Sequence, residues 1–125
     1  AVIIALGNEN AGMFSNDEDL AHAITAAGQT EGEPVWRLPL GAAYDKLIDT
    51  PNADMKNIAG KPVAGSIVGA QFVKRFIKDG TPWAHLDIAG TAWKSGPYED
   101  PLSPAWATGY GVRLLNRLIQ NRYEE

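Results

Sequence analysis

Two side chains with catalytic potential, His85 and Asp87, lie two positions apart in the apolar stretch WAHLDIAGTAW, residues 83–93. Alternate side chains of a β-strand point to opposite faces, so we expect both on one face. One hypothesis is a pair of metal ligands, or a general base with its orienting carboxylate. The other is a buried polar pair that satisfies neighbouring backbone groups. A metal needs three or four ligands, and His22 is the only other histidine, so the sequence favours the structural hypothesis.

The strand is followed by a run of small residues, Ala89-Gly90-Thr91-Ala92. Such a run lets a ligand or another backbone segment approach closely, and open α/β sheets bind their ligands at the carboxyl ends of strands. The alternative is that these small residues only pack the strand against a helix. Motifs such as GxSxG, HExxH, a phosphate-binding glycine loop or an EF-hand loop are absent from the sequence.

The remaining polar groups have simpler interpretations. Asp54 and Asn57 either contact a substrate or stabilise the turn at residues 52–54, and turn stabilisation is the more typical role of Asp and Asn. The acidic run at residues 17–19 is typical of a solvated helix start rather than a metal cluster. A basic face on the last helix indicates a solvated or subunit-contacting surface; its members are Arg113, Arg117 and Arg122.

Hydrophobic periodicity predicts strands and helices that alternate, which is typical of an α/β layer fold. The strands are expected at 2–6, ended by Gly7, and at 83–89, with an extended segment at 36–40. A helix capped by Ser15 or Asn16 should bury Leu20, Ala23, Ile24 and Ala27 and end between Gly28 and Gly32. Three more helices are expected, at 42–48, from Ser66 to about Lys78, and after Gly111. The second should bury Ile67, Ala70, Val73, Phe76 and Ile77 and carry a polar stripe of Gln71, Lys74, Arg75 and Lys78. The third should have one shared face made of Val112, Leu115, Leu118, Ile119 and Arg122. Loops are expected at 8–16, 54–65 and 94–106.

Composition limits the class of protein. The chain has 125 residues, 45% of them hydrophobic, which suffices for one domain with a core. The absence of cysteine excludes disulfides and zinc–cysteine sites, and no apolar run approaches the roughly 18 residues of a membrane span. The net charge of -4 argues against a broad nucleic-acid surface.

Several segments, taken in order, resemble the leucyl aminopeptidases, the di-metal cytosol aminopeptidases. Besides residues 83–93, the matching segments are EPVWRLPL at 33–40, Tyr44, ADMKNI at 53–58, AGSI at 64–67, Phe72, Phe76 and ATGYGVRLL at 107–115. The resemblance covers nearly all of the chain. The family's metal-binding motif, Asn-Thr-Asp-Ala-Glu-Gly-Arg, lies upstream of everything present here. Residues 1–125 therefore resemble the C-terminal portion of the catalytic domain, without the metal-ligand segment.

The resemblance implies an α/β fold: part of a mixed-sheet, zinc-peptidase-like catalytic domain with helices on both faces. It implies a cytoplasmic homohexamer that releases N-terminal amino acids from peptides with two divalent ions, Mn or Zn, none of them bound by residues of this chain. No catalytic residue is expected here. The resemblance implies substrate-pocket wall from Ile58, Ala89 and Ala92. Ala89 and Ala92 would line the pocket for the substrate's N-terminal side chain, where small residues leave room for a leucine-sized group, and Ile58 would line the pocket beyond the scissile bond.

The buried-looking apolar run that opens the chain leads us to expect a piece of something longer. A second hypothesis, from another class, is a non-catalytic assembly fragment or a metal-less homologue that acts as a structural or interaction module. Neither hypothesis assigns this segment a nucleic-acid or membrane partner.

Overall fold

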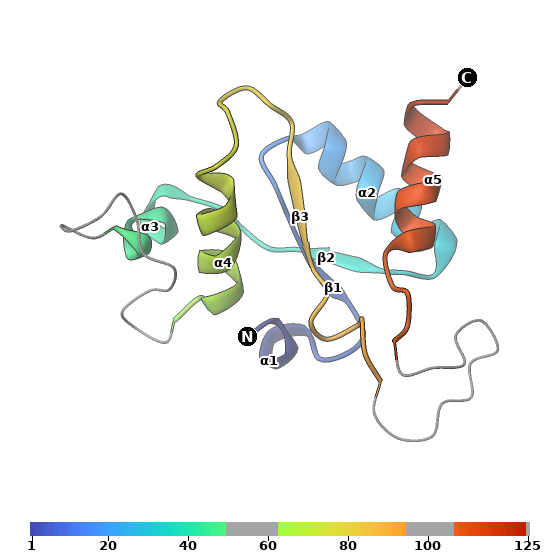
Figure 1. The fold of residues 1–125 in the computed structure, drawn as a ribbon, viewed down its shortest axis with the longest axis horizontal. Coiled ribbons are helices and arrows are strands. Elements are labelled where there is room, and N and C mark those ends of the chain that lie inside the picture. Colours follow the sequence, from blue (N-terminus) through green and yellow to red (C-terminus); the bar gives the residue numbers. More distant parts are fainter. Residues whose placement is uncertain (50–62, 95–106, 125) are drawn as a thin grey trace.

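The computed structural model describes residues 1–49, 63–94 and 107–124. Along the chain, the elements are α1 (Val2–Leu6), β1 (Ala11–Ser15), α2 (Glu18–Glu31), β2 (Val35–Arg37), α3 (Ala42–Asp45), the 3₁₀ turn η1 (Lys46–Ile48), α4 (Gly65–Lys74), β3 (Ala84–Asp87) and α5 (Val112–Arg122) (Figure 1). None of the described helices is long and apolar enough to cross a membrane.

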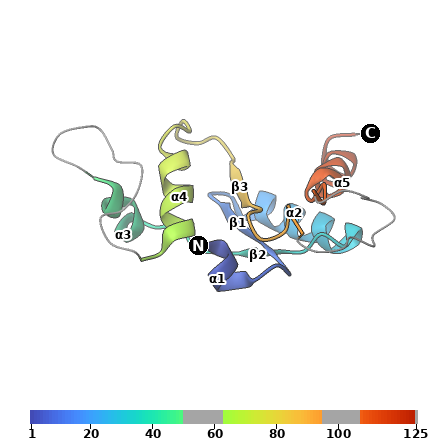
Figure 2. The same cartoon turned by 60° about the horizontal axis from the view of Figure 1, so that its bottom comes forward.

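The three described strands form one mixed sheet in the order β2-β1-β3. β1 runs parallel to β2 and antiparallel to β3. The strands lie between α4 on one side and α2 with α5 on the other (Figure 2). This arrangement confirms the expected α/β fold with a mixed sheet.

Central strand β1 is buried along its whole length. One of its faces, through Ala11 and Met13, joins a core built with α2, β2 and α5, whose other buried members are Ala21, Ile24, Ala27, Val35, Leu114 and Leu118. The opposite face contains Gly12 and Phe14, because side chains alternate along a strand. A Cβ placed on Gly12 would lie 3.0 Å from Val2 Cγ2, so α1 packs closely on that face.

The N-terminal prediction was wrong in two places. The run predicted as a buried strand, residues 2–6, is α1, in which only Val2 is buried and Ile4 is 92% exposed. The buried strand is instead β1, within the stretch 8–16 that was predicted as a loop. A short apolar run does not distinguish strand from helix by periodicity, and the small residues of β1 concealed its strand character.

Helix α2 agrees closely with its prediction, apart from its cap. Asp17 caps it, because its Oδ2 accepts a hydrogen bond from the Leu20 amide at 2.8 Å. The helix ends at Gly32, whose φ of 69° suits glycine. The two predicted caps instead bind the chain before β3: Ser15 Oγ donates to the Trp83 carbonyl, and the Asn16 amide exchanges hydrogen bonds with residues 81 and 83.

Two helix faces were predicted incorrectly. In α4 the buried residues are Val68, Ala70 and Gln71, whereas Phe76, beyond its end, is 68% exposed. Gln71 was expected in the polar stripe, but its Oε1 accepts from the Gly41 amide at 2.8 Å and its Nε2 donates to Asp45 Oδ1 at 3.3 Å. Helix α4 also ends at Lys74, four residues before the predicted end.

In α5 the buried residues are Leu114 and Leu118. Of the predicted face, only Leu118 is buried, and an exposed apolar stripe remains, made of Val112, Leu115 and Ile119. The predicted face was wrong because the contact with α2, rather than the widest apolar stripe, decides which side of α5 is buried.

Helices α3 and α4 are joined by an ion-pair network. The Arg75 guanidinium donates to Asp45 through Nε at 3.0 Å and Nη2 at 2.9 Å, and to Asp49 at 2.6 Å. The hydrogen bond from Arg75 holds the pKa of Asp45 below its ordinary value. The network holds α3, η1 and α4 together as one unit.

Candidate functional site

His85 and Asp87 lie on one face of β3, as predicted. They pair across the sheet with Phe14 and Gly12, respectively. The His85 ring centroid is 5.9 Å from that of Phe14 and 6.3 Å from that of Trp83, with which it stacks at 18°. The imidazole is therefore positioned by aromatic rings on its own strand segment and on β1.

Asp87 is half-buried and stabilises the turn that follows β3. Its Oδ1 accepts a hydrogen bond from the Ala89 amide at 3.2 Å, rather than pairing with His85. Among residues 1–49, 63–94 and 107–124, no group of three or more His, Cys, Asp or Glu side chains could hold a metal ion. The geometry thus gives each member of the pair its own local partner. That metal ligands lie outside this chain stays a prediction.

The small residues after β3 form a tight turn that is partly buried and partly exposed to solvent. The Thr91 and Ala92 amides both donate to the Ile88 carbonyl, at 3.0 and 2.9 Å. Gly90 is buried against the Gly7 carbonyl, where a Cβ would clash with the backbone. The close approach expected at this glycine is therefore made by the end of α1. Ala89 is exposed and Ala92 half-buried, so both remain able to line a pocket.

A second segment, just before α5, lies beside this turn. Trp93 and Ala107 form an antiparallel bridge, and the Thr108 amide donates to the Ala92 carbonyl at 2.9 Å. The Thr108 hydroxyl donates to the Thr91 carbonyl at 2.6 Å and accepts from the Tyr110 amide at 3.2 Å. The turn is thereby joined to the start of α5.

A buried carboxylate, Glu33, caps α5 from a distance in sequence. Its Oε2 accepts from the Gly111 amide at 3.0 Å and its Oε1 from the Leu114 amide at 2.7 Å. The Tyr110 hydroxyl donates to the neighbouring Pro34 carbonyl, and burial raises the pKa of Tyr110. The sequence reading missed Glu33. The available signal was Gly111, which starts a helix without a side chain that could cap it.

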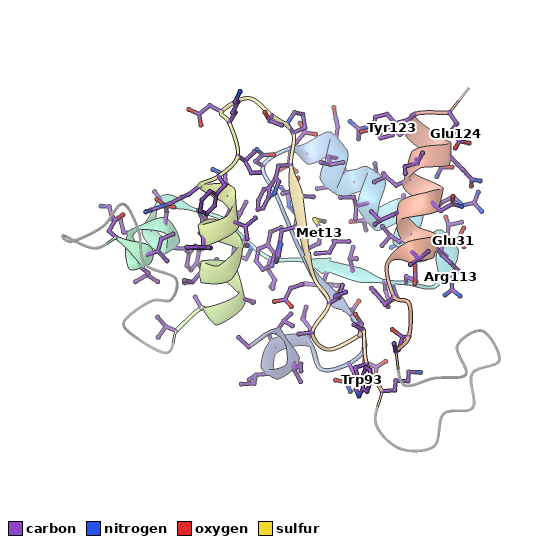
Figure 3. The ribbon with its side chains drawn as sticks, viewed as in Figure 1. Met13, Glu31, Trp93, Arg113, Tyr123 and Glu124 are labelled. Atoms are coloured by element: carbon purple, nitrogen blue, oxygen red, sulfur yellow. The ribbon has the colours of Figure 1, made fainter. Side chains whose placement is uncertain are left out.

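The predicted basic face of α5 is partly held by α2. The Arg117 Nε donates to Glu31 Oε1 at 2.7 Å, and an Arg113 amino group donates to the Glu31 carbonyl at 3.3 Å. Glu31 and Arg113 lie together where α2 ends beside the start of α5 (Figure 3). At the other end of α2, Glu18 of the acidic run pairs with Arg37 at 2.7 Å, which lowers the pKa of Glu18.

A cavity of about 520 Å³ lies beside the start of α5. Its described walls are Asn8, Glu9, Gly32, Glu33, Pro34, Thr91, Lys94, Thr108, Gly109, Tyr110, Val112 and Arg113. Ala89 and Ala92 are not among them, so this cavity differs from the predicted pocket wall. Ile58, the third predicted wall residue, lies outside the described residues, as do Asp54 and Asn57.

The family model for the cytosol aminopeptidase family, catalytic domain, matches residues 1–116. The chain belongs to the cytosol aminopeptidase family. It is 61% identical over 124 residues to a Chelativorans sp. protein named "Probable cytosol aminopeptidase", and 56% identical to one so named from Caulobacter vibrioides. Each match covers 99% of this chain but 24% of the relative.

The same family appears among solved structures. A mutant of tomato leucine aminopeptidase superposes on 97% of this chain and 22% of its own, with a TM-score of 0.84 and 34% identity. The chain therefore spans about a quarter of the length of the family members that it matches. These comparisons confirm the resemblance on which the site prediction was based.

Proposed function

We propose that this chain is the C-terminal portion of the catalytic domain of a leucyl aminopeptidase that releases N-terminal amino acids from peptides. The observation that supports the proposal most directly is the tomato superposition, at a TM-score of 0.84 over 97% of the chain. The sequence identity of 61% to the Chelativorans protein supports it independently.

In this proposal the chain supplies pocket wall and scaffold. Ala89 and Ala92 stand at the carboxyl end of β3, one exposed and one half-buried, and their methyl side chains leave space for a substrate side chain. Ile58 would line the pocket beyond the scissile bond. The buried members of the same turn, Gly90 and Thr91, hold it against α1 and the segment before α5.

Two divalent ions, Mn or Zn, would activate a water molecule and polarise the scissile carbonyl in the complete enzyme. The described residues do not form a site for these two ions. His85 contacts aromatic rings, Asp87 accepts from a turn amide, and among the described residues no third ligand lies near them. From the family resemblance, we propose that the metal ligands lie in the upstream part of the domain. The cytoplasmic location and the homohexameric assembly belong to the same proposal and rest on the family resemblance.

A segment exchange tests the proposal. Residues 1–124 replace the matching quarter of the Chelativorans relative, and hydrolysis of leucine and alanine amides is measured with Mn²⁺ beside the unmodified relative. We expect kcat/KM for leucine amide within about 200-fold of the relative, because pocket changes of a methylene or so cost about 1–3 kcal/mol. An exchange protein that folds and binds metal like the relative but hydrolyses neither amide would support the non-catalytic alternative instead.

Matched substitutions test the pocket wall. Ala89→Leu or Ala92→Leu fills space that a leucine side chain needs, so the leucine-to-alanine ratio of kcat/KM should fall about tenfold or more. Ala26→Leu, at an exposed alanine on α2, is the control and should leave the ratio unchanged. Equal losses on both substrates would show that the two alanines serve only the fold.

A further inference from the structure

Thr108 donates hydrogen bonds to two consecutive carbonyls of the turn after β3. Its hydroxyl donates to the Thr91 carbonyl at 2.6 Å, and its amide donates to the Ala92 carbonyl at 2.9 Å. Inside the turn, the Thr91 and Ala92 amides both donate to the Ile88 carbonyl. Together with the Trp93–Ala107 bridge, Thr108 thus holds Ala92 against the segment before α5.

The segment that carries Thr108 is itself anchored at its far end. Its hydroxyl accepts from the Tyr110 amide at 3.2 Å, and the Tyr110 hydroxyl donates to the Pro34 carbonyl. The next residue, Gly111, donates to the buried Glu33 carboxylate at 3.0 Å. A movement of the turn therefore has to break contacts that lead to β2 and to the start of α5.

We propose that Thr108 is a positioning residue that sets the substrate pocket by holding the turn from Ile88 to Ala92; this inference rests on the proposed aminopeptidase function. Ala92 has a short side chain, so the width of the pocket depends on where its backbone stands. A wall displaced by about 1 Å is enough to lose about 100-fold in rate. Thr108 would thus control which side chains the pocket accepts without touching the substrate.

Thr108→Val in the full-length enzyme tests the proposal, because valine keeps the shape and the backbone bond but removes both hydroxyl bonds. The leucine-to-alanine ratio of kcat/KM should change about tenfold, whereas Thr108→Ser, which keeps the hydroxyl, should stay within about twofold of the wild type. The control is Thr25→Val, which removes a hydroxyl bonded to the Ala21 carbonyl in α2, and should leave the ratio unchanged.

Hydrogen exchange on the 125-residue chain tests the contact independently of activity. Thr108→Val should speed exchange of the Tyr110 amide about tenfold, because that amide loses its acceptor. If Thr108→Val fails to fold, Tyr110→Phe loosens the same segment from its Pro34 end and should shift the substrate ratio in the same direction by about threefold.

The outcomes separate the inference from the proposed function. An active wild type in which Thr108→Val lowers kcat/KM equally for both amides, or Tyr110→Phe leaves the ratio unchanged, overturns the positioning role and leaves the aminopeptidase proposal intact. A wild type that hydrolyses neither amide overturns the proposed function, and the pocket role with it, even where the exchange result shows that Thr108 holds the turn.

Discussion

Removing the carboxylate of Glu33 should destabilise the chain more than any change at its surface. Glu33 is 3% exposed, and both of its oxygens accept from amides at the start of α5. Glu33→Gln keeps the shape and one acceptor oxygen but turns an NH₂ group toward an amide that also donates. Glu33→Ala leaves both amides without the carboxylate.

The expected loss in the free energy of unfolding follows from the two hydrogen bonds that the Glu33 carboxylate accepts. A buried donor that loses its partner costs about 1–3 kcal/mol, so we expect about 2 kcal/mol for Glu33→Gln and about 4 kcal/mol for Glu33→Ala. A chain of 125 residues has an unfolding entropy of about 0.26 kcal/mol/K near its melting temperature. The melting temperature should therefore fall by about 8 °C in Glu33→Gln and by about twice as much in Glu33→Ala.

Thermal unfolding followed by far-ultraviolet circular dichroism measures this directly. Glu31→Gln is the matched control, since it removes the same charge two residues away and breaks only the ion pair with Arg117. Partly exposed pairs contribute about 1 kcal/mol or less, so its melting temperature should fall by about 4 °C at most. If Glu33→Gln melts no lower than Glu31→Gln, then the Glu33 carboxylate is not the cap that the distances indicate.

Four further substitutions have distinct expected results. Asp45→Asn should lower the melting temperature at pH 7, and the gap to the wild type should shrink as the pH falls from about 4, because a carboxylate with a depressed pKa stabilises only while ionised; a constant gap across melts from pH 7 to pH 2 would contradict this. Gly90→Ala should cost about 1–3 kcal/mol in urea unfolding by overpacking, whereas Gly69→Ala, with open space at its Cβ, should stabilise α4 by about 0.5–1 kcal/mol; equal effects would show that the turn has room. Asp87→Asn keeps an acceptor for the Ala89 amide, so it should cost about 0.5 kcal/mol, and calorimetry with Mn²⁺ should detect no tight site in either form of the chain; stoichiometric binding that the substitution abolishes would make Asp87 a ligand.

Helix α2 shows how far sequence reasoning reaches. An acidic first turn, apolar residues at helical spacing and a glycine at the end predicted its extent, and the structure confirms the buried residues Ile24 and Ala27 and an end at Gly32. These signals act within a few residues of one another, so the local sequence is sufficient to specify them.

Strand β1 shows why the same reasoning failed elsewhere. Its residues Ala11 and Gly12 have weak intrinsic strand preference, and the strand exists because β2 and β3 pair with it on both sides. By contrast, the apolar run at α1 had the composition of a buried strand, but it pairs with no strand among the described residues. The burial of α5 depended in the same way on where α2 lies.

The sequence by itself determined the family, the α/β class, most helices and the small-residue turn after β3, because these depend on local pattern and on motifs that survive in order along the chain. Only the tertiary structure decided which strand is central, which face of α5 is buried, and that Glu33 caps a helix beginning 79 residues later. Contacts between residues so far apart in sequence form only when folding brings distant segments together. The partner of each residue is then set by how those segments pack, rather than by its neighbours in sequence.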